Sequence, residues 1–196
     1  MNQSAVESAK EIFDRRMSAE QLAHTKAWWG SLVQDKARLV AWMQKLYNSE
    51  IHGFQEYTAF IDRYRPDAPT QVLLRQLADD ERRHAAIIQQ CLGYWGEMAI
   101  PGTTKSQYWN EMQRHAHDFK SACAVKFYGE HLASQRFIVL RDDPFTPDDL
   151  FHAFRWIGPD EEAHCSIMYT LAGPEAIVKM EEHHLKAVAN LLKKNS

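Results

Sequence analysis

Hydrophobic residues recur three or four positions apart along most of the chain, which is the spacing of an α-helix. Between positions 150 and 172, for example, the apolar series runs through Leu150, Phe154, Ile157, Met168 and Leu171. Strand-like alternation is absent outside short connectors. The pattern therefore predicts an all-α protein.

Proline, glycine and capping residues divide this pattern into helical segments. We expect an N-terminal amphipathic helix at about 6–29, where Gly30 either ends the helix or lies inside a longer one. Four long segments and a final helix should follow, at about 32–64, 67–93, 106–141, 146–172 and 174–192. Pro159 should kink or restart the fourth long segment, because proline removes a helical hydrogen bond.

Four long segments with a connection through Gly96, Pro101 and Gly102 after the second predict a four-helix bundle with a crossover. We expect one domain over 1–196, with a bundle at 32–172, an N-terminal helical extension at 1–31 and a C-terminal helix at 174–193. The two flanking helices exceed what a bundle needs. They are expected either to cap the bundle or to form a homodimer interface.

A motif of one glutamate followed by Glu-x-x-His occurs twice. Glu50 precedes Glu81 by 31 residues, and Glu130 precedes Glu161 by the same 31 residues. A histidine stands three positions after the second glutamate in each copy, at His84 and His164. Because positions three apart share a helical face, each Glu-x-x-His directs a carboxylate and an imidazole at one point.

All four glutamates fall within the apolar faces of their segments, where an unpaired carboxylate is costly. Two divalent ions would cancel the four negative charges. Carboxylate oxygens combined with imidazole nitrogens suit Fe(II) or Mn(II) better than structural zinc. The sequence therefore predicts a site for two iron or manganese ions, with six ligands: Glu50, Glu81, His84, Glu130, Glu161 and His164.

Residues next to these ligands predict supporting roles. Metal-bound imidazoles usually donate their second N–H to a carboxylate, so Asp80 and Asp160 are each expected to reach the histidine of the other motif. Tyr57, two turns after Glu50, is expected to hydrogen-bond a ligand carboxylate, and it is also a candidate for a radical.

Small residues follow the two single glutamates, Gly53 after Glu50 and Ala133 after Glu130. They either leave room for a bound molecule or let the helices approach closely. On the first interpretation a largely apolar pocket is lined by Gly53, Phe54, Ala133, Ser134 and Phe137.

The composition of the chain limits which classes of binding partner we expect. The 196 residues carry a net charge of −3, which gives no reason to expect nucleic acid or anionic lipid as a partner. We find no apolar run long enough to span a bilayer and no signal-peptide pattern. Three cysteines, far apart in helical segments, are expected to be buried thiols of a reducing cytoplasm. Without a C-x-x-C pair, a rubredoxin-type iron centre in this chain is excluded.

Histidines outside the repeated motif are also candidates for metal ligands. A third Glu-x-x-His runs from Glu181 to His184, but no aspartate precedes it and the 31-residue spacing is lost. A glutamate and a histidine three apart are common on exposed helices. His115 and His117 are two apart, so they should lie on different faces and be exposed to solvent.

Asp-Glu-x-x-His on two helices, with single glutamates on two others, resembles the ferritin-like di-iron carboxylate superfamily over about 32–172. Glu50, Tyr57 and the motif ending at His84 resemble the first half of the rubrerythrin pattern, and Asp-Glu-x-Arg-His at 80–84 is similar to bacterial di-iron monooxygenases. Rubrerythrins have a further glutamate where this chain has Ala133, and they carry a rubredoxin domain. Storage ferritins lack the histidine found here at His164.

The resemblance implies a ferritin-like bundle with two iron or manganese ions. It further implies an oxidoreductase, of the monooxygenase type, that uses O2 to oxidise or hydroxylate a small hydrophobic or aromatic substrate. An external electron donor is expected, because the sequence has no flavin or nicotinamide motif. Two alternatives stay open: peroxidase-like or catalase-like detoxification, and iron binding with ferroxidase or storage activity.

Overall fold

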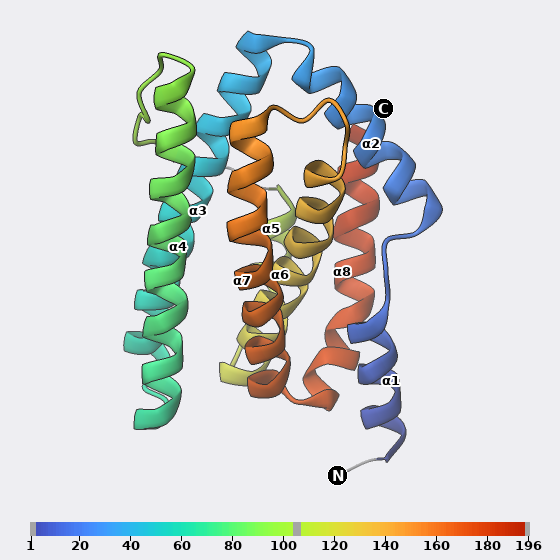
Figure 1. The fold of residues 1–196 in the computed structure, drawn as a ribbon. Helices are drawn as coiled ribbons and strands as arrows, with labels where there is room; N and C mark the ends of the chain where they lie inside the picture. The colour runs from blue at the N-terminus through green and yellow to red at the C-terminus, as the bar shows by residue number, and fades with distance from the viewer. Residues whose placement is uncertain (1–2, 104–106, 195–196) are drawn as a thin grey trace. The chain divides into compact units, whose positions relative to one another are not determined.

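The computed structural model describes residues 3–103 and 107–194, without the side chains of 192–194. Within these ranges the chain forms eight helices and no strand (Figure 1). The helices are α1 (Gln3–Asp14), α2 (Ala19–Val33), α3 (Lys36–Tyr64), α4 (Ala68–Tyr94), α5 (Gln107–Gln113), α6 (Phe119–Arg141), α7 (Asp148–Ala172) and α8 (Pro174–Lys194). The all-α prediction is confirmed for the described residues.

The chain divides into two compact units. The first contains Met1–Thr25, Lys105–Phe137 and Glu161–Ser196, and the second contains Lys26–Thr104 and Ile138–Asp160. The boundaries fall inside α2, α6 and α7, so each of these helices contributes residues to both units. A single domain over 1–196 stays a prediction.

The N-terminal segment breaks earlier than the sequence pattern suggests. One helix was expected at 6–29, whereas α1 ends at Asp14 and α2 begins at Ala19. Ser18 causes the restart: its hydroxyl accepts from the Gln21 backbone N–H at 3.1 Å, and the Gln21 side chain accepts from the Ser18 N–H at 2.8 Å. This capping box satisfies two backbone donors at the new helix start. Gly30 lies inside α2.

The third long segment is also two helices, which corrects the prediction of one helix at about 106–141. Position 106 lies outside the described residues. The chain leaves the helix after Gln113 and re-enters it at Phe119. Asp118 caps α6, because its carboxylate accepts from the Ser121 N–H at 2.8 Å. A helix of 7 residues, α5, and a helix of 23 residues, α6, therefore replace the predicted continuous one.

The remaining helix boundaries lie close to the predicted positions. Asp67 caps α4 by accepting from the Thr70 N–H at 2.9 Å. Arg65, in a left-handed conformation at φ 44°, ends α3 and directs its N–H to the Ile61 carbonyl. Helix α7 begins at Asp148 and continues through Pro159, so of the two expected effects of this proline, the restart does not occur and the kink stays a prediction.

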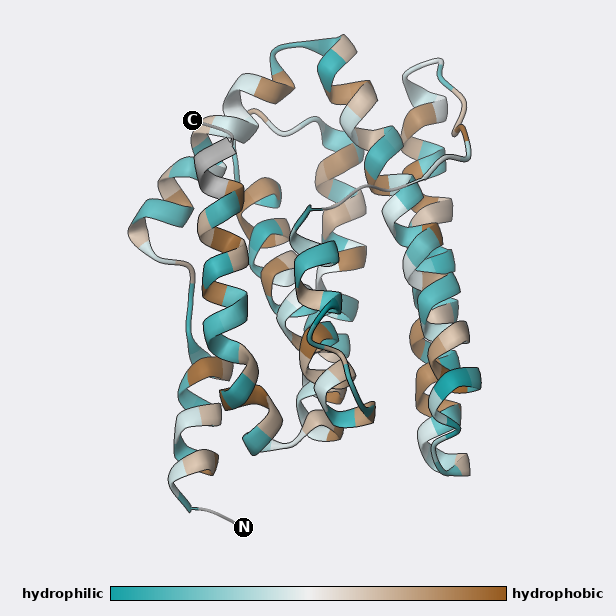
Figure 2. Ribbon diagram, turned by 180° about the vertical axis from the view of Figure 1, so that it is seen from behind, coloured by the Kyte–Doolittle hydropathy of each residue, from teal (hydrophilic) through white to brown (hydrophobic). Residues whose placement is uncertain are grey.

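Buried hydrophobic side chains occur in both units. Hydrophobic and hydrophilic residues are interspersed along the helices (Figure 2). In the second unit α3 packs against α4 (Figure 1), and Trp29 makes edge contacts with Trp42 and Phe154 at centroid distances of 5.0 and 5.9 Å. In the first unit α8 packs against α1 and α5. Phe13 there contacts the ring of Tyr169 at 4.9 Å.

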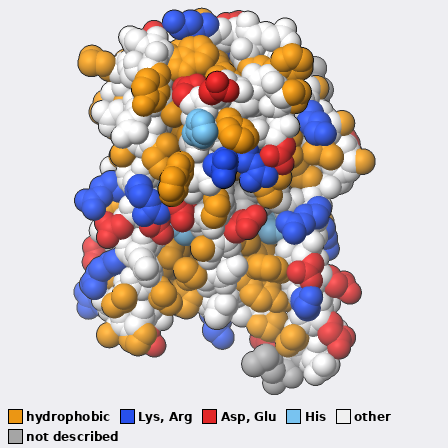
Figure 3. Space-filling model, in the orientation of Figure 1, with side chains coloured by type: hydrophobic (Ala, Val, Ile, Leu, Met, Phe, Trp, Pro, Cys, Tyr) orange, Lys and Arg blue, Asp and Glu red, His pale blue; other side chains and the backbone are white. Residues whose placement is uncertain are grey.

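Side chains of both charge signs are interspersed with hydrophobic ones on the face in Figure 3. No helix in the described part of the chain is long and apolar enough to cross a membrane. All three cysteines are free and buried, as predicted.

Candidate metal centre

In the second unit, α3 and α4 bring one copy of the repeated motif together. Glu50 of α3 and Glu81 and His84 of α4 each offer a ligand atom, and these atoms all lie within 4.8 Å of one another. The three side chains are buried, with exposed fractions of 6%, 6% and 0%. Glu81 and His84 share a face because they are three apart in α4, and the packing of α3 on α4 adds Glu50. We name these three residues the second-unit trio.

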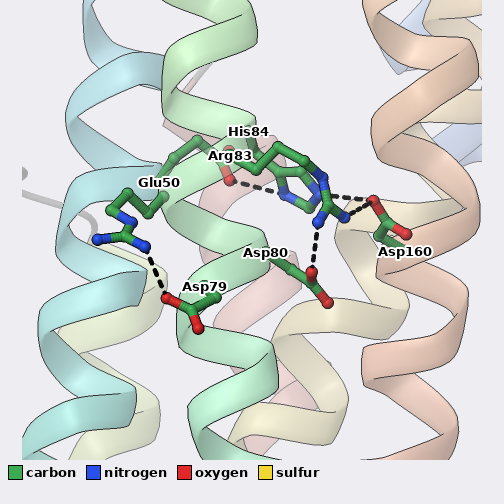
Figure 4. Close-up of polar contacts among 7 residues, drawn as sticks. Glu50, Asp79, Asp80, Arg83, His84 and Asp160 are labelled. Atoms are coloured by element: carbon green, nitrogen blue, oxygen red, sulfur yellow. Dashed lines mark hydrogen bonds and ion pairs between the residues drawn. The ribbon is translucent and has the colours of Figure 1, made fainter.

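The two nitrogens of His84 face different carboxylates (Figure 4). Nδ1 lies 3.4 Å from Glu50 Oε2, and Nε2 lies 3.1 Å from Asp160 Oδ2. A proton on Nε2 donates to the Asp160 carboxylate and leaves the Nδ1 lone pair facing Glu50. This is how a ligating imidazole is usually oriented. It is also the contact that the sequence predicts for Asp160.

Arg83 holds Asp160 in place (Figure 4). Its Nη2 donates to Asp160 Oδ2 at 2.7 Å, while Nη1 donates to Asp80 Oδ1 at 2.7 Å. Burial acts to raise the pKa of Asp160, but hydrogen bonds from Arg83 and His84 outweigh it and lower the pKa below its usual value. Asp160 is therefore a carboxylate at neutral pH. The predicted contact of Asp80 with the other histidine stays a prediction.

Gly53 lies directly against Glu81. A Cβ at this position would be 2.6 Å from Glu81 Oε2 and 2.9 Å from Cδ, closer than such atoms approach in proteins. The space that the missing side chain leaves is thus occupied by the Glu81 carboxylate. This supports close helix approach as the reason for the glycine.

In the first unit, α6 and α7 bring together the other copy of the motif. Glu130, Glu161 and His164 offer ligand atoms that also lie within 4.8 Å of one another. These side chains have exposed fractions of 8%, 3% and 1%. They are the first-unit trio. The two copies of the sequence motif therefore form the same kind of cluster, each with two carboxylates and one imidazole.

Cys165 follows His164 directly but is not part of the trio. Burial raises the pKa of the Cys165 thiol to about 12, with a further contribution from Glu130, Glu162 and Glu161. It therefore stays a neutral thiol at pH 7. One turn further along α7, the ring of Tyr169 contacts the ring of Phe127 of α6 at a centroid distance of 5.6 Å.

The remaining predicted site residues lie on the expected helices. Tyr57 is fully buried on α3, and Phe54 is half-buried with the Arg82 guanidinium over its ring at 5.8 Å. On α6, Ser134 is buried and its hydroxyl donates to the His131 carbonyl at 3.1 Å. Ala133 is half-buried and Phe137 is buried. A pocket formed by these residues stays a prediction.

The third Glu-x-x-His has other partners. Glu181 forms an ion pair with Arg15, and His184 Nδ1 lies 2.8 Å from the Tyr108 hydroxyl. Glu181 and His184 are thus engaged separately, and no metal-ligand cluster in the described residues includes them. His115 is half-buried and stacks on His183 at a centroid distance of 3.6 Å, so it is less exposed than predicted, whereas His117 is exposed as predicted.

Sequence reasoning missed the role of Arg83. Its position three residues after Asp80 was a usable signal, because Asp and Arg at this spacing pair on a helix. Its second contact, with Asp160, joins residues 77 positions apart and has no local signature.

The donor set fits metal ions. Four buried carboxylates need positive charge nearby, and two divalent cations would balance them. Carboxylate and imidazole donors without thiolates match the preference of iron and manganese. The buried glutamate and histidine residues are therefore able to bind metal ions.

Comparisons of the chain with models of known families, with characterised proteins and with solved structures gave no match. The interpretation of the site consequently rests on its own residues.

Proposed function

We propose that the protein is a ferritin-like four-helix bundle that binds two iron ions, or manganese in their place, and that the residues of the two trios are the ligands. The support is the repeat itself: each copy supplies two buried carboxylates and one buried imidazole. Helix α7 adds to this support. It carries Asp160, which contacts His84 of the second-unit trio, directly before Glu161 of the first-unit trio.

We propose further that the protein is an oxidoreductase that oxidises or hydroxylates a small hydrophobic or aromatic molecule. Iron held by such ligands supplies the activation of O2, with electrons from an external donor. The carboxylates of Glu50, Glu81, Glu130 and Glu161 balance the metal charge. Asp160 and Arg83 fix the tautomer and orientation of His84, and burial keeps bulk water from the ligands.

The first experiment measures metal directly. Protein purified without added metal, then loaded anaerobically with Fe(II), should contain about two ions per chain by elemental analysis. Glu81→Gln should lower this number, because an amide neither balances charge nor binds metal as well as a carboxylate. Glu182→Gln is the matched control, since Glu182 is exposed on α8. Equal metal content in the two variants would contradict the proposal.

A second measurement separates the metal-binding role from a structural one. In the metal-free protein, Glu81→Gln should leave stability unchanged or raise it, because it removes a buried charge. In the metal-loaded protein the same change should lower stability. A loss of similar size in both forms would mean that Glu81 serves packing alone.

The reaction is tested by oxygen consumption of the reduced, iron-loaded protein with a panel of small aromatic and aliphatic compounds. Consumption that depends on one organic class, with an oxidised product by mass spectrometry, supports the oxidoreductase. Peroxide turnover without such dependence would instead indicate a peroxidase or catalase. Uptake of many irons per chain in a large assembly would indicate storage.

We also propose that the protein forms a homodimer through its N-terminal and C-terminal helices. Helices α1 and α8 pack against each other in the first unit, and Arg15, just after α1, pairs with Glu181 of α8. Light scattering measures the mass directly. A monodisperse monomer at micromolar concentration would exclude the dimer.

A further inference from the structure

A buried tyrosine and a half-buried histidine form a hydrogen-bonded pair in the first unit. The Tyr108 hydroxyl of α5 lies 2.8 Å from Nδ1 of His184 on α8, and these two helices pack together. Only 6% of Tyr108 is exposed. The pair lies outside both trios, and the oxidation chemistry proposed above does not use it.

Both partners of this hydrogen bond are neutral at pH 7, and the histidine tautomer sets its direction. Burial, with smaller contributions from the nearby His131 and Arg15, lowers the pKa of His184 to about 4. The imidazole is therefore neutral at pH 7. Burial raises the pKa of Tyr108, as do the charges of Tyr128 and Glu130, so the phenol keeps its proton. In the tautomer that carries the imidazole proton on Nε2, the phenol donates and Nδ1 accepts.

The surrounding rings hold the imidazole in this orientation. The Tyr128 ring stacks on His184 with a centroid distance of 4.4 Å and an interplanar angle of 20°. The Tyr108 ring meets the imidazole edge-on at 88°. The Tyr128 hydroxyl donates to the Ile177 carbonyl at 2.9 Å. Both tyrosines are buried. Tyr108 donates to the imidazole of His184, which is a base, whereas Tyr128 donates to a backbone carbonyl, which is not a base.

We propose that Tyr108 and His184 form a redox-active pair. A one-electron oxidant removes one electron from the Tyr108 phenol, the O–H bond breaks, and the proton forms an N–H bond at His184 Nδ1. The products are a neutral tyrosyl radical and an imidazolium. Return of one electron to the oxygen, with transfer of the proton back, restores both residues.

The geometry favours this step for an electrostatic reason. A phenol that loses an electron becomes a strong acid, so oxidation without proton loss would leave a positive charge on a buried ring. A neutral base already at hydrogen-bond distance removes that charge from the ring without any movement of heavy atoms. Because only 6% of Tyr108 is exposed, burial also shields the radical from other molecules.

The oxidant is a strong one-electron acceptor, either the oxidised metal centre of the proposed function or a small diffusible oxidant. The charge of Glu130 in the first-unit trio contributes to the raised pKa of Tyr108, so the pair and that trio interact electrostatically. The pair would carry oxidising equivalents away from the ligands. The chemistry of the pair itself does not require the metal.

The test uses the metal-free full-length chain, so its outcome is independent of the proposed metal function. Illumination of tris-bipyridyl ruthenium(II) with persulfate generates the one-electron oxidant, and electron paramagnetic resonance follows the radical. The wild type should show a long-lived tyrosyl signal. Tyr108→Phe should abolish that signal, whereas Tyr128→Phe and Tyr94→Phe should retain it, the latter because Tyr94 is 79% exposed.

His184→Gln separates a redox pair from a hydrogen bond that merely fastens α5 to α8. Glutamine can still accept from the phenol, but an amide is not a base at neutral pH. The radical lifetime should fall by about an order of magnitude or more. Urea unfolding of the variant should give a stability close to that of the wild type, which shows that α5 and α8 still pack together. An unchanged lifetime in His184→Gln, or a wild-type signal that survives in Tyr108→Phe, would overturn the proposal.

A measurement on the unmutated protein covers the case in which Tyr108→Phe fails to fold. Electron–nuclear double resonance of the wild-type radical should show an exchangeable proton that belongs to an imidazolium and is lost in D2O. A radical without that coupling would also overturn the proposal. A failure here would leave the metal-content experiment unaffected, so the two proposals fail separately.

Discussion

His84 and Asp160 are in direct contact although 76 positions separate them, with Nε2 of the imidazole 3.1 Å from Oδ2 of the carboxylate. The contact connects α4 with α7 within the second unit. It decides which ring nitrogen carries the proton, and therefore which nitrogen is presented to Glu50. A carboxylate outside the second-unit trio thus sets the chemistry inside it.

Asp160→Asn should weaken metal binding without removing a ligand. The amide loses the charge that holds the His84 N–H and the ion pair with Arg83. Loss of such a partner lowers metal affinity by about 10–100-fold, measurable by competition with a chromophoric chelator. Asp79→Asn is the control, because Asp79 pairs with Arg82 on the surface and is 63% exposed. Equal affinities in the two variants would show that Asp160 has no such role.

Gly53→Ala should disrupt the second-unit trio. The new Cβ would stand 2.6 Å from Glu81 Oε2, so the carboxylate must move. We expect a loss of about 1–3 kcal/mol in the free energy of unfolding, together with reduced metal uptake. Gly30→Ala provides the comparison, since no atom lies within 4 Å of a Cβ there. Because Gly30 lies inside helix α2, Gly30→Ala should raise the free energy of unfolding by about 0.5–1 kcal/mol. Similar effects of Gly53→Ala and Gly30→Ala would be inconsistent with the structure.

Stability should fall in mild acid because of His184. Its folded-state pKa is about 4, below the value of 6.5 for an unperturbed histidine. Between these values the unfolded chain binds a proton that the folded chain does not, so stability present above pH 6.5 is lost progressively as pH falls toward 4. Burial of His131 lowers its pKa too.

The measurement is urea unfolding of metal-free wild type and His184→Gln at pH 7 and pH 5. The wild type should lose about 2 kcal/mol more than the variant between these pH values. Glutamine preserves an acceptor for Tyr108 but does not titrate. Parallel losses in the two proteins would mean that His184 is protonated in the folded state.

Asp118 should matter for stability through its cap on α6. Asp118→Ala removes the acceptor for the Ser121 N–H and should cost about 1 kcal/mol in urea unfolding. Asp118→Asn keeps an acceptor oxygen, so it should cost much less. The pKa of Asp118 is lowered by hydrogen bonds from the Ser121 backbone and side chain, which shows that the folded state favours the carboxylate. An equal cost for alanine and asparagine would indicate that the cap is not formed in solution.

Helix boundaries show where the sequence pattern was sufficient. Asp67 followed by Pro69 was recognised as the start of α4, because a cap and an early proline interrupt the apolar period visibly. Ser18 and Asp118 were overlooked, because the apolar spacing continues across both breaks. There the local hydrogen bonds of a cap prevail over a pattern that reports only which face is buried.

The sequence alone determined the helical character and the composition of each trio's Glu-x-x-His, because a spacing of three places two side chains on one face in any helix. Tertiary structure decided the contacts of Arg83 with Asp160, of Gly53 with Glu81 and of Tyr108 with His184. Each joins different helices, and its distance depends on how the side chains of those helices pack. Periodicity describes one helix at a time, so it carries no information about such pairs.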